Sequence, residues 1–398
     1  MMNETDRYYF QKAEAAYVRQ FGGKPSEKWI KGNGRLEIIG NHTDHQLGHC
    51  LVASATLSLR AAIGPDPVLV SILSDGYPPF TFPSNDLARK ESEAGRPIGL
   101  TRGVMHYLKE AGYQVGGFRA ALIGNVASGS GVSSSAAYEL FVAEAMNALY
   151  NEGKIPPLIM AKAGQFAENV YFGKASGILD QTGSAFGGLS YMDLTKGEPK
   201  VESIAWPFAD EVKIYLVNPR SSHAGLGSLY DAMPGDMRKV ASLFGKKVLS
   251  EVDEATFYAK ANALALPEKV VDRARHFFYE ERQVKLAKRA LEERNLDFFL
   301  TLERMTELSQ EKLLRNVMIE PSRYASSPLE AVEVARSATL RSAHRVMGGG
   351  LAGNTINFVV KEEEAAFKKA IAGRYGEDAI IEVGISHLGA TEVEKETI

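Results

Sequence analysis

Phosphate chemistry is suggested by a run of glycine and serine residues, Gly129-Ser130-Gly131-Val132-Ser133-Ser134-Ser135-Ala136. The run follows a strand-like segment and opens an apolar helical one. Glycines permit tight turns that expose backbone N–H groups, and the N-terminal end of a helix attracts anions. Serine hydroxyls can also bind the Mg²⁺ that accompanies a nucleotide. The run therefore predicts a phosphate-binding loop, although an ordinary turn with a helix cap has the same composition.

Sugar chemistry is suggested by a dense group of polar side chains in residues 34–45, which read G-R-L-E-I-I-G-N-H-T-D-H. A carboxylate can accept hydrogen bonds from two vicinal hydroxyls, while a histidine and an amide can supply donors. A polar turn that satisfies its own backbone is one alternative. A transition-metal site made by His42, Asp44, His45 and His49 is another. One short turn seldom directs four side chains at a single ion, so the sugar interpretation is preferred.

A second glycine cluster lies at residues 348–353, shortly before a strand-like segment. Glycines allow close approach of the backbone to a ligand phosphate or to a neighbouring strand. Neither a Walker loop nor the protein-kinase signature set occurs in the chain, so two common designs for phosphoryl transfer are excluded.

The overall composition favours a small-molecule partner. The net charge is -3, from 46 basic and 49 acidic residues, so there is no broad positive field for nucleic acid or an anionic membrane. No stretch approaches about 20 consecutive apolar residues. The first residues, MMNETDRYYFQK, lack the apolar core of a signal peptide, and the single cysteine, Cys50, cannot form an internal disulfide. We expect a cytoplasmic protein and, by default, a monomer.

The elements that must position these residues follow from periodicity. Strands are expected at residues 35–39, 118–126, 212–216 and 356–360, and helices at 134–150 and 158–172, the second ended by Gly173. Residues 267–316 favour helix. Composition shifts near residue 195, which predicts two domains, 1–195 and 196–398, with the ligand site in the cleft between them.

Together these segments resemble the signature motifs of the GHMP kinase superfamily, and the first resembles the galactokinase signature GRxNxIGEHTDY. The segment Ile178-Leu179-Asp180-Gln181 is similar to the family's G-I-M-D-Q, and the resemblance covers about residues 15 to 385. It implies a two-lobed α+β fold, with an N-terminal lobe like domain 2 of ribosomal protein S5 and a C-terminal GHMP kinase lobe. It also implies ATP and Mg²⁺, and transfer of the γ-phosphoryl group to the anomeric C1 hydroxyl of galactose or a close analogue.

The resemblance assigns roles to individual positions. Asp180 matches the catalytic aspartate and Arg35 the arginine that faces it, while Ser135 and Glu168 match the magnesium ligands. An arginine would keep the aspartate ionised, and the aspartate would orient or deprotonate the attacking hydroxyl. Residues 129–136 match the ATP-binding loop. The positions that match sugar contacts are Arg35, Asn41, His42, Asp44, Gly177, Asp180 and Tyr230, with His223 seven residues before Tyr230.

Departures from the signature concern the sugar. Asn41 replaces a glutamate that receives the C6 hydroxyl in the family, and His45 replaces a tyrosine. Loss of that negative charge suggests a uronic acid such as galacturonate, or another C6-modified sugar, as an alternative substrate. Glu37 replaces an asparagine and shares a strand face with Arg35, so a salt bridge between them is an open possibility. Further departures are Asn33, Ala127, Met347 and Ala352.

Two rival functions remain open at this point. One is another GHMP kinase activity, such as that of a mevalonate-type or homoserine kinase, although these lack the G-x-H-T-D segment. The other is a catalytically silent sensor that binds ATP and galactose, against which Asp180, Arg35, Ser135 and Ala136 all argue.

Overall fold

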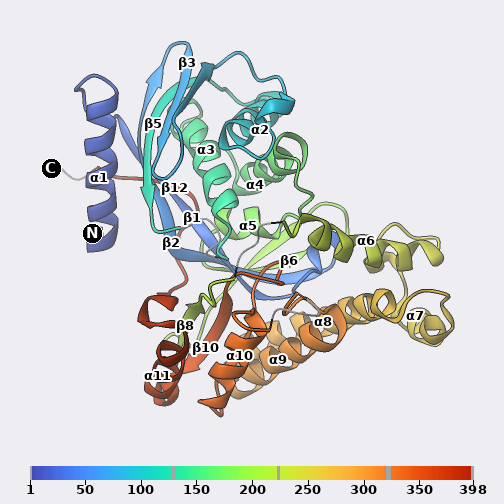
Figure 1. The fold of residues 1–398 in the computed structure, drawn as a ribbon. Helices are drawn as coiled ribbons and strands as arrows, with labels where there is room; N and C mark the ends of the chain where they lie inside the picture. Colours follow the sequence, from blue (N-terminus) through green and yellow to red (C-terminus); the bar gives the residue numbers. More distant parts are fainter. Residues whose placement is uncertain (1, 127–130, 222–224, 320–323, 396–398) are drawn as a thin grey trace.

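A computed structural model describes residues 2–126, 131–221, 225–319 and 324–395. Its first lobe is built on a sheet with the strand order β12-β1-β2-β5-β3-β4, in which β6 also pairs with β2, and β7 pairs with β6 (Figure 1). All pairings are antiparallel except that of β3 with β5. The strands are β1 Lys28–Ile39, β2 His49–Asp66, β3 Leu69–Ser74, β4 Phe80–Pro83, β5 Gly117–Gly124, β6 Leu189–Asp193, β7 Lys200–Ile204 and β12 Thr391–Val393.

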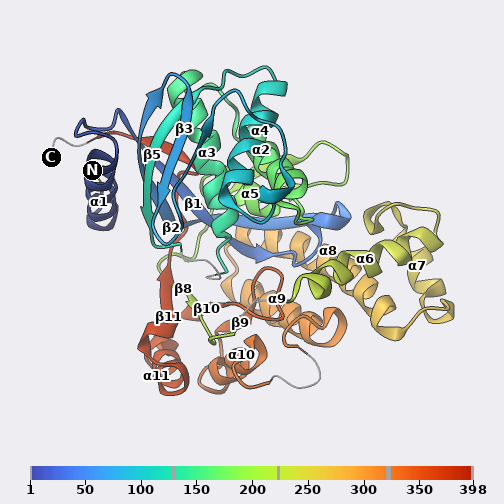
Figure 2. The ribbon, with the colours of Figure 1, turned by 45° about the horizontal axis from the view of Figure 1, so that its top comes forward.

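Helices cover both faces of this sheet. Helix α1 packs Phe10, Ala13 and Tyr17 against one face, and the other helices of the lobe lie on the opposite face (Figure 2). Helix α3 is apolar on nearly every side because it is enclosed by the sheet and its neighbouring helices. The helices are α1 Glu4–Gln20, α2 Pro97–Glu110, α3 Ser134–Tyr150, α4 Pro157–Phe166 and α5 Leu179–Ala185.

The second lobe contains an antiparallel sheet with the order β11-β8-β10-β9. Helices α10 and α11 pack on one side of it. Helices α8 and α9 pack on the other side and share a core with the first lobe, while α6 and α7 project away from the body (Figure 1). The elements are β8 Val212–Val217, β9 Ala343–Val346, β10 Thr355–Val360, β11 Ile380–Val383, α6 Gly227–Leu243, α7 Glu254–Lys260, α8 Glu268–Glu292, α9 Leu296–Ser309, α10 Pro328–Ser337 and α11 Glu364–Tyr375.

The two lobes share an apolar core. Leu36 and Ile38 of β1 belong to the same buried cluster as Phe299 of α9 and Phe358 of β10. Burial of such side chains contributes about 1.5–3 kcal/mol each. The lobes are therefore held together by packing, and the strand that carries the first polar motif is part of the joint.

The predicted elements agree with the structure in type. Helix α3 has the predicted bounds, and the helix predicted at 158–172 is α4 followed by a π-helical turn, Ala167–Phe172, that ends at Gly173 with a φ of 86°. Strand β1 begins at Lys28, earlier than predicted, because its N-terminal half pairs with β2 and β12. Strands β7 and β12 follow residue 195 in sequence but pair within the first sheet, so the boundary near residue 195 stays a prediction.

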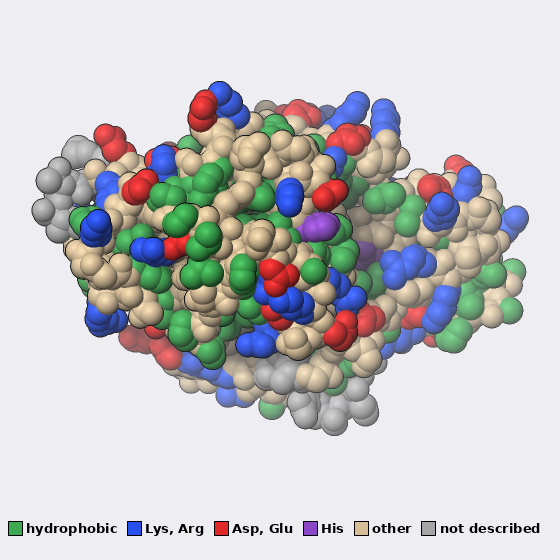
Figure 3. Space-filling view, turned by 90° about the horizontal axis from the view of Figure 1, so that it is seen from above, with side chains coloured by type: hydrophobic (Ala, Val, Ile, Leu, Met, Phe, Trp, Pro, Cys, Tyr) green, Lys and Arg blue, Asp and Glu red, His purple; other side chains and the backbone are tan. Residues whose placement is uncertain are grey.

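The surface carries charges of both signs. On the face drawn in Figure 3, basic and acidic side chains are interspersed rather than gathered by sign. Among the described residues, no helix is both long and apolar enough to cross a membrane.

Candidate active site

The centre of the site is an ion pair between Arg35 of β1 and Asp180 in the first turn of α5. Arg35 Nε donates to Asp180 Oδ1 at 2.7 Å, and Ser133 Oγ donates to Asp180 Oδ2 at 2.8 Å. Burial raises the pKa of Asp180, but Arg35, Lys174 and the Ser133 hydroxyl outweigh it and hold the pKa below its usual value. Asp180 is therefore an ionised acceptor held in a fixed orientation.

The predicted phosphate loop leads into helix α3 beside this pair. Ser133 has a φ of 56°, and its side chain does not cap the helix because its hydroxyl binds Asp180. The first N–H groups of a helix have no partner within the helix, so this end can accept phosphate oxygens. Gly131 O accepts a hydrogen bond from Arg35 Nη1, and Val132 O accepts one from the Arg35 N–H at 2.9 Å. Gly129 and Ser130 lie outside the described residues, as do Ala127 and His223.

Ser135 and Glu168, which the resemblance assigns to magnesium, are in direct contact. Ser135 Oγ donates to Glu168 Oε1 at 2.9 Å, and Glu168 is fully buried. Its other oxygen, Oε2, accepts from Gln181 Nε2 at 3.0 Å. A hydroxyl and a carboxylate are the hard oxygen donors that Mg²⁺ takes alongside substrate phosphates, so the residues fit this ion. Sequence analysis gave no role to Gln181, which fixes the carboxylate from behind.

Asp44 lies against the segment that precedes Asp180. Its Oδ2 accepts from the Leu179 N–H at 3.3 Å and its Oδ1 accepts from the His45 N–H at 2.8 Å. A Cβ at Gly177 would lie 1.8 Å from Asp44 Oδ2, which explains why position 177 requires glycine. Burial, followed by the charge of Asp180, raises the pKa of Asp44 to about 6.

Asn41, His42 and Tyr230, which sequence analysis assigned to the sugar, hold the glycine cluster of the second lobe. Asn41 Nδ2 donates to Gly348 O at 2.6 Å, His42 Nε2 lies 3.3 Å from Gly349 O, and the Tyr230 hydroxyl donates to Gly350 O at 2.8 Å. Asn316 Nδ2 also donates to Gly349 O at 3.3 Å. Asn41 and His42 therefore join the first lobe to the glycine cluster of the second lobe, and Tyr230 and Asn316 hold the cluster within its own lobe.

The histidines of the first motif form a neutral pair. His42 Nδ1 lies 3.0 Å from His45 Nε2, and burial lowers the pKa of His42 and takes that of His45 well below its usual value. Among the residues that the structure describes, no three His, Cys, Asp or Glu side chains gather as a metal site.

The possible salt bridge between Glu37 and Arg35 is not formed. Glu37 Oε1 instead accepts from Arg345 Nη1 at 3.0 Å, and the two Glu37 oxygens lie 3.0 and 3.1 Å from Asn41 Nδ2. Strand β1 has irregular register on both sides of this stretch, and Arg35 turns to Asp180. A carboxylate nevertheless lies beside Asn41, because both Glu37 oxygens contact this amide. The alternative of a C6-modified sugar stays a prediction. The signature has an asparagine at position 37 and a glutamate at position 41. This chain has the carboxylate and the amide in the opposite order.

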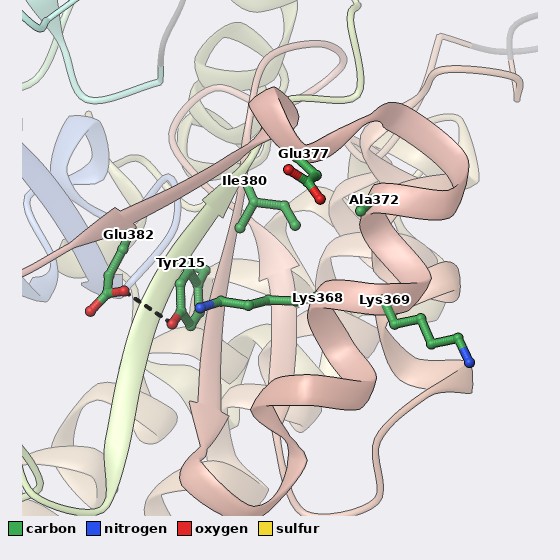
Figure 4. Close-up of a pocket in the computed structure, with 7 residues that line it drawn as sticks. All are labelled: Tyr215, Lys368, Lys369, Ala372, Glu377, Ile380 and Glu382. Carbon is green, nitrogen blue, oxygen red and sulfur yellow. Dashed lines mark hydrogen bonds between the residues drawn. The ribbon is translucent and has the colours of Figure 1, made fainter.

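A surface pocket of about 420 Å³ lies elsewhere, between β8, β11 and α11 (Figure 4). None of the residues assigned to sugar or nucleotide lines it. The Tyr215 hydroxyl at its wall lies 2.7 Å from Glu364 Oε1 and 3.2 Å from Glu382 Oε2, the two possible acceptors of its single proton. The pocket is lined by Tyr215, Lys368, Lys369, Ala372, Glu377, Ile380 and Glu382.

Comparison with known proteins shows which family models and relatives this chain matches. Residues 99–188 match the model of the GHMP kinases N terminal domain, and residues 15–65 match the galactokinase galactose-binding signature. The chain is 28% identical to a galactokinase of Lactococcus lactis over 373 residues, which cover 91% of this chain and 90% of the relative. It is 29% identical to a galactokinase of Streptococcus thermophilus over 356 residues, covering 86% and 88%.

Solved structures show the same fold. The crystal structure of Lactococcus lactis galactokinase complexed with galactose superposes with a TM-score of 0.82 at 24% identity, covering 96% of this chain and 98% of that one. A D-glycero-D-manno-heptose 1-phosphate kinase gives a TM-score of 0.62 at 16% identity, covering 93% and 99%. The chain thus has the GHMP kinase fold. Within that class, its sequence resembles the galactokinases.

Proposed function

We propose that this protein is an ATP-dependent sugar kinase of the galactokinase type, which transfers the γ-phosphoryl group to the C1 hydroxyl of galactose or a close analogue. The observation that carries the proposal is the placement of Asp180. This ionised carboxylate lies between Arg35 and Ser133, at the head of the helix whose N-terminus can hold phosphate. The similarity to galactokinases over most of the chain supports the choice of sugar.

In this proposal each residue has a defined task. Asp180 accepts a hydrogen bond or proton from the attacking hydroxyl, and Arg35 keeps Asp180 ionised and supplies positive charge that would stabilise the phosphoryl group during transfer. Ser135 and Glu168 would hold Mg²⁺, which when bound neutralises charge on the phosphates. Because the transition state is loose, positioning and electrostatics supply most of the acceleration.

The test is ATP turnover by the purified protein with Mg²⁺ across galactose, galacturonate, N-acetylgalactosamine, glucose and arabinose. We expect galactose to give the highest kcat/KM and the product to be the 1-phosphate, as read by phosphorus NMR. Binding of ATP and galactose without turnover would instead identify a sensor, and turnover of a non-sugar acceptor such as mevalonate would identify another GHMP kinase activity.

The exchange between Glu37 and Asn41 gives a prediction about both stability and specificity. Asn41→Glu alone places a carboxylate against Glu37 and removes the donor to Gly348 O, so we expect it to destabilise the protein by about 2–4 kcal/mol. The double variant Glu37→Asn/Asn41→Glu restores the order of the signature and removes the repulsion. We expect it to be more stable than the sum of the single variants by about 1–3 kcal/mol and to retain galactose turnover.

Urea unfolding of the wild type, both single variants and the double variant gives the coupling free energy between residues 37 and 41. Strictly additive costs would show that the two side chains are not coupled. Galactose and galacturonate turnover by the same four proteins shows whether the position of the carboxylate affects the choice of sugar.

A further inference from the structure

Lys174 is a cation at the proposed metal site that sequence analysis did not identify. It follows Gly173, which ends the π-helical turn, and precedes the segment that leads to Asp180. Its Nζ lies 2.8 Å from Glu168 Oε1. The Lys174 side chain is 55% exposed, whereas that of Glu168 is 0% exposed, so a lysine at the surface pairs with a buried carboxylate.

The ammonium occupies the oxygen that a metal ion would need. Ser135 Oγ donates to the same Glu168 Oε1 at 2.9 Å, while Glu168 Oε2 is held by Gln181. An ion bound by Ser135 and Glu168 would therefore compete with Lys174 for Oε1. The ammonium is also attracted by the negative charge of Asp180. The Asp180 carboxylate accepts a hydrogen bond from Ser133 at the start of α3, the helix end that can bind phosphate.

We propose that Lys174 is a mobile positioning cation of this site, which neutralises Glu168 when no metal is bound and moves to the phosphates when metal and nucleotide bind. The proposal rests on the proposed function of the Asp180 site. The flexible four-carbon stem of lysine allows its ammonium to change partners, and ammonium groups bind phosphate oxygens well.

Lys174 has two roles in this proposal, competition with the metal for Glu168 and contact with the phosphates. In Lys174→Met the two roles predict changes of opposite sign in the binding affinities for metal and for nucleotide. Affinity for Mn²⁺ alone, measured by electron paramagnetic resonance, should rise by about 5-fold because the competitor is gone. Affinity for ATP in EDTA, measured by calorimetry, should fall by about 5- to 10-fold because a phosphate contact is lost. General damage to the site would weaken both.

Lys162→Met is the matched control, since Lys162 also pairs with a glutamate, Glu198, but lies outside the site. It should leave both affinities unchanged. Turnover should fall by about 100-fold in Lys174→Met, with the KM for sugar little changed, and Lys174→Arg should recover part of it. If Lys174→Met binds Mn²⁺ no more tightly and ATP no more weakly than the wild type, the proposal is wrong, whether or not the wild type phosphorylates galactose.

Discussion

Asp180→Asn is expected to lower kcat for sugar phosphorylation by about 10²- to 10⁴-fold, the range lost when a general base is removed. Asparagine keeps the size of the side chain but not the charge that Arg35 and Ser133 hold in place at 2.7 and 2.8 Å. Since the pKa of Asp180 is held below its usual value, the wild type has the carboxylate ionised throughout the neutral range. The effect should therefore persist at every pH from about 6 to 9.

Binding should survive this change. Calorimetric affinities for galactose and for ATP with Mg²⁺ are expected to stay within a few-fold of the wild type, because an amide can still hydrogen-bond the sugar hydroxyl. Asp378→Asn is a suitable control, since Asp378 pairs with Arg220 at 2.6 Å on the surface. An unchanged kcat in Asp180→Asn would show that Asp180 has no catalytic role. Loss of sugar affinity without loss of kcat would show that Asp180 only binds the sugar.

Arg345→Met should cause the largest loss of stability, about 3–5 kcal/mol, the cost of leaving buried charges without their partner. Arg345 is 0% exposed and pairs with Glu37 at 3.0 Å and Glu303 at 2.7 Å. Its Nη2 also donates to Glu37 O at 2.6 Å, so it fastens β9 to β1 across the lobes. Urea unfolding at pH 8 measures the loss.

The loss should depend on pH. Burial raises the pKa of Glu303 to about 7 and that of nearby Glu280 to about 8, above the ordinary value of 4.5. Groups with raised folded-state pKa values stabilise the fold when protonated, so this contribution is present near pH 4.5 and is lost as the pH rises through 7 and 8. Without Arg345 the carboxylates protonate more readily, and the difference from wild type should be smaller at pH 5 than at pH 8.

Arg341→Met provides the comparison for an exposed pair. Arg341 lies 2.8 Å from Asp297, with side chains 51% and 74% exposed, and its loss should cost less than about 1 kcal/mol. An equally small cost for Arg345→Met, or a cost that does not change between pH 5 and pH 8, would contradict the interpretation of Arg345 as the link between lobes.

The local elements and the composition of the motifs can be predicted from the sequence. The apolar run at 134–150 and the glycine at 173 specify a helix and a helix end through neighbours close in the chain. Arg35, Asp180, Ser135 and Glu168 were assigned to the site by their resemblance to the galactokinase motifs, and the structure places Arg35 against Asp180 and Ser135 against Glu168.

The pairing of the buried polar groups depends on how distant parts of the chain pack together. Glu37 binds Arg345 rather than Arg35, and Asn41, His42 and Tyr230 hold the carbonyls of the glycine cluster. Each buried polar group takes the partner that the packing of distant segments presents to it, and no local pattern specifies that choice. For the same reason Lys174 could not be identified from the sequence. It became a candidate because the fold places its ammonium against Glu168 Oε1, the oxygen that also accepts a hydrogen bond from Ser135.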